Sequence, residues 1–216
     1  MKITLTSIPF AASFTVIILA VILAACSEQA AVNKGEAAAP PVKAKQWTQD
    51  EYFALLQKKA EAGSAEAQFS LGWIYMRGEG FTGVTYMRDV PKDFAKAHDW
   101  FQKAAMQGHA KAQYNLGMLY KLGLGLKQDN SHALMWIEKA AAQGHDVAQY
   151  QLGAIYAEGS GVEPHLSRAC AWLNLAAAQN NEKAKKNYSD IDAKLTPAQR
   201  DECRQLAATW EKGKII

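Results

Sequence analysis

The sequence predicts an all-α protein, a solenoid of about four repeated helix pairs, on two observations. Alanine, the strongest helix former, is abundant and often doubled, as in Ala104-Ala105. The chain also resembles itself at steps of 36 residues, a period typical of stacked helix pairs. Hydrophobic residues make up 49% of the chain and charged residues 21%, an ordinary balance for a globular protein with a packed core.

Residues 1–25 predict a signal peptide. Lys2 precedes an uncharged, mostly apolar run of 18 residues, Ile8 to Ala25. The run ends in LAAC at 23–26, which resembles the lipobox of bacterial lipoproteins, where the chain is cleaved before the cysteine and Cys26 would be acylated. An uncleaved transmembrane anchor is the alternative, because a run of this length almost spans a bilayer. Both interpretations place the rest of the chain outside the cytoplasm.

The residues after the cysteine predict a tether rather than a fold. In Gram-negative lipoproteins, an aspartate directly after the lipidated cysteine usually retains the protein in the inner membrane. This chain has Ser27 at that position, so the resemblance implies a lipid anchor in the outer membrane, facing the periplasm. Residues 26–45 contain no aromatic residue, no periodic apolar face and a Pro-Pro pair. Such a segment cannot bury enough apolar surface to fold, so we expect a disordered tether and a folded domain at 46–216.

The 36-residue repeat sets the predicted organisation of that domain. Three tryptophans and three turn residues recur at this step, as do several glycines and tyrosines. The aligned sets are Trp100, Trp136 and Trp172; Gly108, Gly144 and Asn180; Gly117 and Gly153; Tyr120 and Tyr156. An earlier unit joins the register if residues 81–89 are treated as an insertion. The predicted units are 46–94, 95–130, 131–166 and 167–195, followed by a capping helix at 196–212.

Each unit encodes two helices. Ala97 and Phe101 begin an apolar stripe at helical spacing, and Ala112 and Leu116 begin another after a turn. Gly117 lies inside the second helix, where glycine costs about 1 kcal/mol relative to alanine. Its recurrence in the other units predicts close contact with a neighbouring helix.

The two ends of the domain depart from the repeat, as capping elements do. Thr48 and Glu51 form a predicted capping box before the first helix. Thr196 and Gln199 form another, with Pro197 at the first helical position. The helix that starts there is expected to cover the last repeat.

These residues resemble the Sel-like repeat (SLR) family, a relative of the tetratricopeptide repeat. The pattern AxxWxxKAAxQGxxxAQxxLGxxYxxGxG stands almost complete in residues 97–125, and the resemblance covers about residues 50–190. It implies a right-handed α/α superhelix in which each unit buries its face against its neighbours. It also implies a concave groove lined by the first helix of each pair.

Positions that change between units on those first helices are candidates for contacting a partner. Residues at equivalent positions of successive units form a column. Cys170 shares a column with His98 and Leu134, but it is a candidate for a disulfide and not for partner contact. The groove candidates are His98, Asp99, Gln102, Leu134, Met135, Glu138 and Asn174. Their polar and methionine-containing character suits a peptide or protein segment, although simple solvation of these side chains is an equal alternative. The insertion supplies the loop candidates Phe81, Tyr86 and Met87.

No catalytic motif accompanies the repeat. The chain lacks G-x-S-x-G, H-E-x-x-H and S-x-x-K, so we predict no enzyme, no catalytic residue and no cofactor. His109 and His145 occupy one turn position in adjacent units; stacked repeats would hold them about 10 Å apart, too far for a shared metal, and no metal site is predicted. Trp100, Trp136 and Trp172 are interpreted as packing residues, with a ligand-stacking ladder as the alternative.

The remaining cysteines and the charge bound the class of protein further. Cys170 and Cys203 remain once Cys26 is lipidated, and in an oxidising compartment a disulfide between them is favoured over two buried thiols.

Without Lys2 the chain has 23 basic and 21 acidic side chains, a balance that argues against nucleic acid as a partner.

These observations favour an adaptor that is anchored in the membrane and binds a protein or peptide in the periplasm. An immunity protein that neutralises a toxin delivered to the periplasm is the first alternative, because some Sel-like lipoproteins resemble such neutralisers. A β-lactam- or peptidoglycan-directed enzyme is the least favoured alternative, because its motifs are missing.

Replacing Cys26 tests the anchor. Cys26→Ser should leave an unprocessed precursor that takes up no labelled palmitate, because the thiol that receives the diacylglycerol is gone. Gel migration and metabolic labelling check this outcome. Unchanged labelling and migration would contradict the lipobox interpretation.

Overall fold

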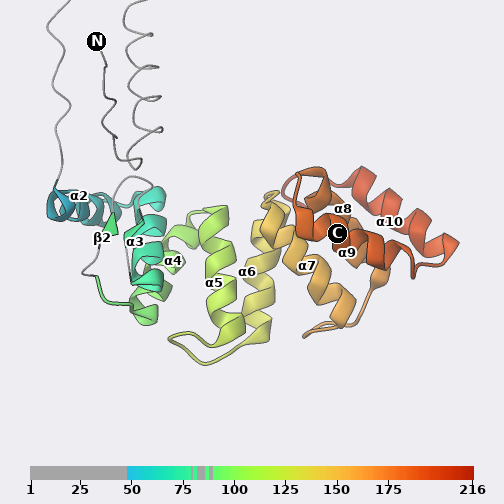
Figure 1. Cartoon of the computed structure of the whole chain (residues 1–216), viewed down its shortest axis with the longest axis horizontal. Helices are drawn as coiled ribbons and strands as arrows, with labels where there is room; N and C mark the ends of the chain where they lie inside the picture. The colour runs from blue at the N-terminus through green and yellow to red at the C-terminus, as the bar shows by residue number, and fades with distance from the viewer. Residues whose placement is uncertain (1–47, 79, 82–85, 88–89) are drawn as a thin grey trace, which may run out of the picture. The chain divides into compact units, whose positions relative to one another are not determined.

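A computed structural model describes residues 48–78, 80–81, 86–87 and 90–216 (Figure 1). The predicted signal peptide, Cys26 and the tether up to residue 45 lie outside the described residues. In the described part the chain forms antiparallel helix pairs, each made of a first and a second helix. The pairs are α2 (Gln49–Glu61) with α3 (Ala65–Arg77), α4 (Phe94–Met106) with α5 (Ala110–Leu122), α6 (Asn130–Ala142) with α7 (Asp146–Glu158), and α8 (Leu166–Ala178) with α9 (Glu182–Asp192); α10 (Pro197–Thr209) follows.

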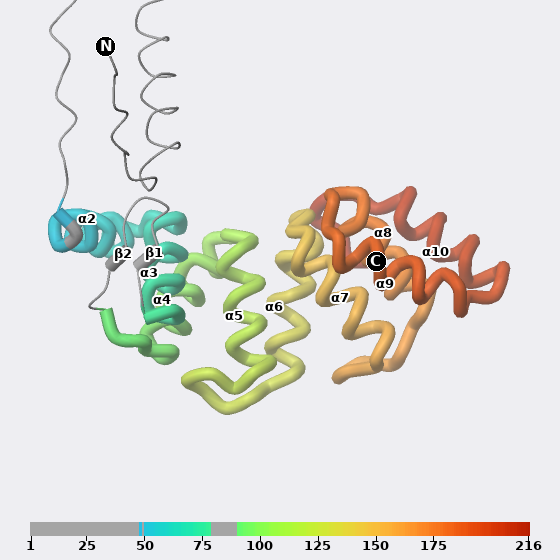
Figure 2. The backbone as a smooth tube through the Cα atoms, viewed as in Figure 1, coloured from blue at the N-terminus to red at the C-terminus, as the bar shows by residue number. Residues whose placement is uncertain are grey.

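This arrangement confirms the all-α helical repeat solenoid. The turns within pairs and the turns between pairs lie at opposite ends of the helices (Figure 2). Each second helix packs more extensively against the first helix of the next pair than against the first helix of its own. None of the described helices has the length and apolar character needed to cross a bilayer.

The insertion after α3 differs from the predicted loop. It contains two short antiparallel strands, β1 (Gly80–Phe81) and β2 (Tyr86–Met87), with Gly80 opposite Met87 and Phe81 opposite Tyr86. A two-residue ladder is too short to leave an alternating apolar pattern, so the strands could not be predicted from periodicity. The side chains of the loop candidates Phe81, Tyr86 and Met87 lie outside the described part of the structure.

Side chains cap the start of every described helix. Both predicted capping boxes are confirmed, at Thr48 with Glu51 and at Thr196 with Gln199. His109 and His145 cap second helices, where the Nδ1 atom of each accepts a backbone N–H at 3.2 Å. The recurrence of histidine at this turn therefore has a local explanation, the satisfaction of an otherwise unpaired helix N–H.

The recurring glycine inside the second helices permits close helix contact, as predicted. A Cβ atom on Gly117 would lie 2.8 Å from Ile137 Cγ1 and 3.0 Å from the Ala133 carbonyl oxygen. Gly153 meets Leu173 in the same way, at 2.7 Å. The large apolar side chain of the next first helix thus fills the space that a side chain on the glycine would need.

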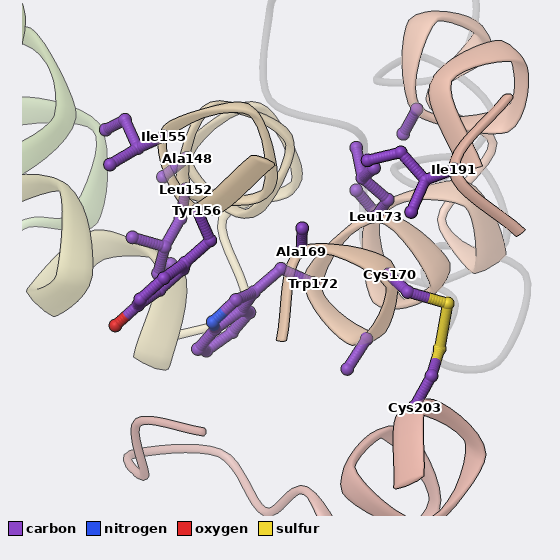
Figure 3. Close-up of a cluster of buried hydrophobic side chains, with 14 of the residues drawn as sticks. Ala148, Leu152, Ile155, Tyr156, Ala169, Cys170, Trp172, Leu173, Ile191 and Cys203 are labelled. Carbon is purple, nitrogen blue, oxygen red and sulfur yellow. A yellow bond between two sulfur atoms is a disulfide. The ribbon is translucent and has the colours of Figure 1, made fainter. Parts of the chain in front are cut away.

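The tryptophans pack as expected at two of three positions. Trp172 is fully buried and Trp136 nearly so, whereas Trp100 is only half-buried. Lys103 places its ammonium 4.2 Å from the centre of the Trp100 ring, and Lys139 does the same to Trp136 at 4.4 Å. Figure 3 shows Trp172 beside Tyr156 in the largest buried cluster of the domain.

A buried glutamine on each of α3, α5 and α7 links its pair to the next. Gln149, which is fully buried, donates from Nε2 to the Ala141 carbonyl oxygen at 3.2 Å, near the end of the first helix of its own pair. Its Oε1 accepts from Gln179 Nε2, at the end of the next first helix, at 2.8 Å. Gln68 with Gln107, and Gln113 with Gln143, repeat the arrangement at 2.7 and 2.6 Å. We call this series the glutamine relay.

The relay predicts an energetic coupling between adjacent pairs. Gln149→Met should lower the free energy of unfolding by about 0.5–1.5 kcal/mol, because it removes two hydrogen bonds, while the Ala141 carbonyl keeps the Gly144 N–H and the exposed Gln179 amide reaches water. Once Gln149 is replaced, Gln179→Met should cost much less than it does alone. Urea unfolding of both single variants and the double variant measures this coupling. Strictly additive losses would show that the two amides act independently.

Candidate protein-interaction surface

The predicted groove residues lie on α4, α6 and α8, the first helices of the last three pairs. We call the side chains in these columns the first-helix face. Asp99 and Met135 are exposed, and the other candidates are half-buried: His98, Gln102, Leu134, Glu138 and Asn174. Cys170 and Ala171, which occupy the same columns on α8, are completely buried. The face is therefore accessible on α4 and α6 and covered on part of α8.

On α4, His98 is held in place by Tyr120 of α5. His98 Nε2 lies 3.3 Å from Tyr120 Oη, and its Nδ1 lies 3.2 Å from a carboxylate oxygen of Asp99. The His132 ring stacks on Tyr120 with the ring centres 5.1 Å apart. These contacts fix the imidazole of His98 at the edge of the face and leave the Asp99 carboxylate toward solvent.

On α6 the carboxyl group of Glu138 is partly withdrawn from water. Burial raises the pKa of Glu138, and this effect is opposed by a hydrogen bond from Tyr156 Oη, at 3.4 Å, and by the charge of Arg168. Met135, one turn away, is 38% exposed. An apolar contact and an acidic group thus lie one turn apart.

On α8 the chain's own C-terminal helix covers the face. The Cys170–Cys203 disulfide joins α8 to α10 (Figure 3), with the Cα atoms 5.7 Å apart. Trp210 meets Trp172 edge to face at 6.4 Å between ring centres. Beyond α10, the Gly213 N–H donates to the Ala142 carbonyl oxygen at the end of α6, at 2.6 Å.

The expected cap therefore exists, but it lies along the first-helix face rather than only closing the end of the stack. Sequence reasoning missed this placement. The signal was present: α8 carries Cys170, Ala171 and Leu175 where α4 carries His98, Asp99 and Lys103. A column that turns apolar in the last unit indicates that something covers it there.

The first-helix face lies apart from the two pockets described for this domain. Its candidates line neither of two pockets of about 530 and 540 Å³, which lie at the α5–α6 turn and on α2–α3. A surface without a deep enclosed pocket suits a peptide or protein segment better than a small ligand. Within the residues that the structure describes, no three His, Cys, Asp or Glu side chains are placed to hold a metal ion.

The stacked pairs, the glycine contacts and the open first-helix face define an α/α repeat protein of the interaction-scaffold type. The model of the Sel1 repeat matches residues 65–109, 110–145 and 146–181, more than half of the chain. The chain belongs to the Sel1 repeat family. Each matched unit contains a second helix and the first helix that follows it, the two helices with the most extensive contact.

Two solved structures support this assignment. A protective antigen of uropathogenic Escherichia coli with an SLR fold is 35% identical, with a TM-score of 0.66 over 76% of this chain and 33% of that one. A Sel1 repeat protein from Oxalobacter formigenes is 37% identical, with a TM-score of 0.56 over 64% of this chain and 98% of that one. This chain thus spans about a third of the length of the E. coli antigen. The comparison with curated proteins found no match.

The disulfide between α8 and α10 can be tested on the purified chain. Unfolded without reductant, the chain should show no free thiol from Cys170 or Cys203. Reduction should lower the stability by about 3–4 kcal/mol, the chain-entropy value for closing a loop of this length. Thiol titration and thermal melts measure both effects, and a Cys170→Ala, Cys203→Ala variant should not respond to reductant. Two free thiols in protein isolated from the periplasm would contradict the bond.

Proposed function

We propose that the chain is a membrane-anchored adaptor of the periplasm that binds a peptide or protein segment along the first-helix face of α4 and α6. Sel1 repeat proteins generally mediate protein–protein interactions and act as non-catalytic scaffolds. The proposal adds a surface, a kind of ligand and a location to that general role.

The position of α10 carries the proposal. The first-helix face of this chain already receives one helix, because α10 buries Cys170 and Ala171 of α8. The same columns continue on α6 and α4 without a described helix against them. The side that receives a segment of the chain itself is therefore the side on which we expect a segment of another protein.

The composition of the open part describes the ligand. Leu134 and Met135 offer apolar contact at its centre, and Met106, at the end of α4, is 74% exposed. Asp99 and Glu138 contribute negative charge. A segment with an apolar stripe and flanking basic residues fits this arrangement, and the flexible thioethers tolerate more than one shape of side chain.

The anchor rests on the sequence at 23–26 and on the resemblance of that motif to the lipobox. Acyl chains on Cys26 would hold the domain at the membrane, since each buried methylene contributes about 0.8 kcal/mol. The tether at 26–45 would let the domain reach a partner away from the bilayer surface.

Changing the face should abolish binding without unfolding the protein. A variant with Asp99→Arg, Gln102→Arg, Met135→Glu and Glu138→Lys should bind the partner at least tenfold more weakly, which is about 1.4 kcal/mol. A photo-crosslinking residue at position 106 of the otherwise unchanged protein identifies that partner in whole envelopes, and purified components then give the affinity.

The matched control carries Leu122→Glu, Gln128→Arg, Glu158→Lys and Asp190→Arg, which change exposed residues outside the first-helix face with the same types of substitution and the same change in net charge. Its binding should equal that of the unchanged chain, and thermal melts should show both variants folded. Undiminished binding by the first-helix variant would direct attention to the 81–89 insertion instead.

A further inference from the structure

The first helix of the domain, α2, carries a row of side chains that no described helix covers from the outside. The row consists of Tyr52, Leu56 and Lys59, spaced four and three residues apart. Tyr52 is 37% exposed and Lys59 is exposed, whereas Leu56 contacts the core formed with α3. We call it the α2 row.

The three other first helices show what normally covers this row. The equivalent residues are Ala97, Phe101 and Ala104 on α4; Ala133, Ile137 and Ala140 on α6; and Ala169, Leu173 and Ala176 on α8. All nine are at most 2% exposed. In each case the second helix of the preceding pair lies on the row, and its glycine receives the central large side chain, as Gly117 receives Ile137.

Leu56 has the central position of the α2 row, but no described second helix supplies a glycine for it. Leu56 itself is only 7% exposed through its contact with α3, while Tyr52 and Lys59 on either side of it are exposed. Tyr52, Leu56 and Lys59 line a pocket of about 540 Å³ with Phe69, Ser70 and Trp73. The pocket has ten lining residues, including Glu66, whose carboxylate lies 2.9 Å from His109 Nε2. Three of the ten, Tyr52, Phe69 and Trp73, are aromatic, a residue type enriched at the centre of protein interfaces.

A second copy of this chain is a poor occupant. The second helix with no first helix after it is α9, whose residues at the contacting positions are Lys185, Lys186 and Ser189, where α7 has Gln149, Tyr150 and Gly153. Lys185 and Lys186 would approach Lys59 with like charge. The C-terminal end therefore does not complement the α2 row.

We propose that the α2 row and its pocket bind an amphipathic α-helix of a partner protein, one with acidic residues beside its apolar stripe. The helical form follows from the three internal junctions, each of which is a helix on an equivalent row. Tyr52 and Lys59 replace alanines, so the incoming helix lies farther out and inserts a larger side chain between Tyr52 and Trp73. Lys59 favours carboxylates at the edge. This site is separate from the first-helix face and does not depend on the function proposed above.

Two segments of the chain itself are suitable probes because both cover such rows internally. The α7 sequence, DVAQYQLGAIYAE, contains two acidic residues and no basic one; the α5 sequence, AKAQYNLGMLYKL, contains two basic residues and no acidic one. Each would be made as a capped peptide with a hydrocarbon staple on its outer side, because a free helix of this length is marginal in water. The full-length chain in lipid nanodiscs is titrated against each labelled peptide, with empty nanodiscs as the blank.

The α7 peptide should bind in the micromolar range and the α5 peptide at least tenfold more weakly. Tyr52→Glu and Ser70→Arg should each weaken binding of the α7 peptide at least tenfold, and Tyr52→Phe should retain it. Leu122→Glu is the control, because Leu122 is a large apolar side chain that is 57% exposed and belongs neither to the α2 row nor to the first-helix face. Lys59→Glu should reverse the order of the two peptides.

Four outcomes would overturn the proposal. One is the absence of binding by the α7 peptide at about 1 mM, a concentration that detects even weak association. Another is equal binding to the Tyr52→Glu and unchanged chains. A dimer that dissociates on Tyr52→Glu would identify a second copy as the occupant. Binding that appears only after removal of residues 27–45 would identify the chain's own N-terminal segment.

Discussion

The glutamine relay is the interaction on which the stacking of this solenoid depends most directly. A buried amide needs hydrogen-bond partners, and each relay glutamine finds one in its own pair and another in the next. A neighbouring pair that slipped by one residue would leave the buried relay amide without its partner, at a cost that apolar contacts alone would not impose, whereas the exposed partners Gln107 and Gln179 would still reach water. The relay therefore specifies register, whereas the alanine-rich helix faces supply close packing with little geometric preference. It stops at Lys185, the residue in the glutamine column of α9, whose ammonium binds Glu182 and Asn180 instead.

The parts of the fold that depend on local sequence could be predicted from it. Capping boxes, turn residues and helical spacing act over three to seven residues. The capping box of Thr48 and Glu51, and the close helix contact at Gly117, could therefore be predicted from the sequence around them. Even the substitution of Asn180 for a turn glycine keeps the left-handed backbone, with φ at 66°. What could not be predicted depends on distant segments. The burial of Cys170 follows from where α10 folds back, and the half-exposed state of Trp100 follows from what its neighbours leave uncovered. The relay was visible as a glutamine column, but a polar column on a helix does not reveal whether it faces water or another amide.

The candidate surface shows the same division. The repeat identified the first helices and their changing columns, and the structure places all seven candidates on α4, α6 and α8. The sequence did not show how much of the first-helix face the chain covers for itself. Nor did it single out Tyr52 and Trp73, because their significance appears only when α2 is compared with three helices that have a neighbour. The two ends of the domain are thus built differently: a disulfide-linked helix covers one, and an aromatic pocket opens on the other.

The position of the glycine, the glutamine and the large apolar residue within each repeat has a consequence for how such a protein can change in length. Every 36-residue segment carries one half of the junction before it and one half of the junction after it. A tandem duplication of that length, starting at any residue, would bring a complete set of complementary halves and would join at both sides without altering the existing units. Gene duplication in this protein can therefore lengthen the array by whole helix pairs, whereas an insertion of another length has to be placed in a turn, as the 81–89 segment is.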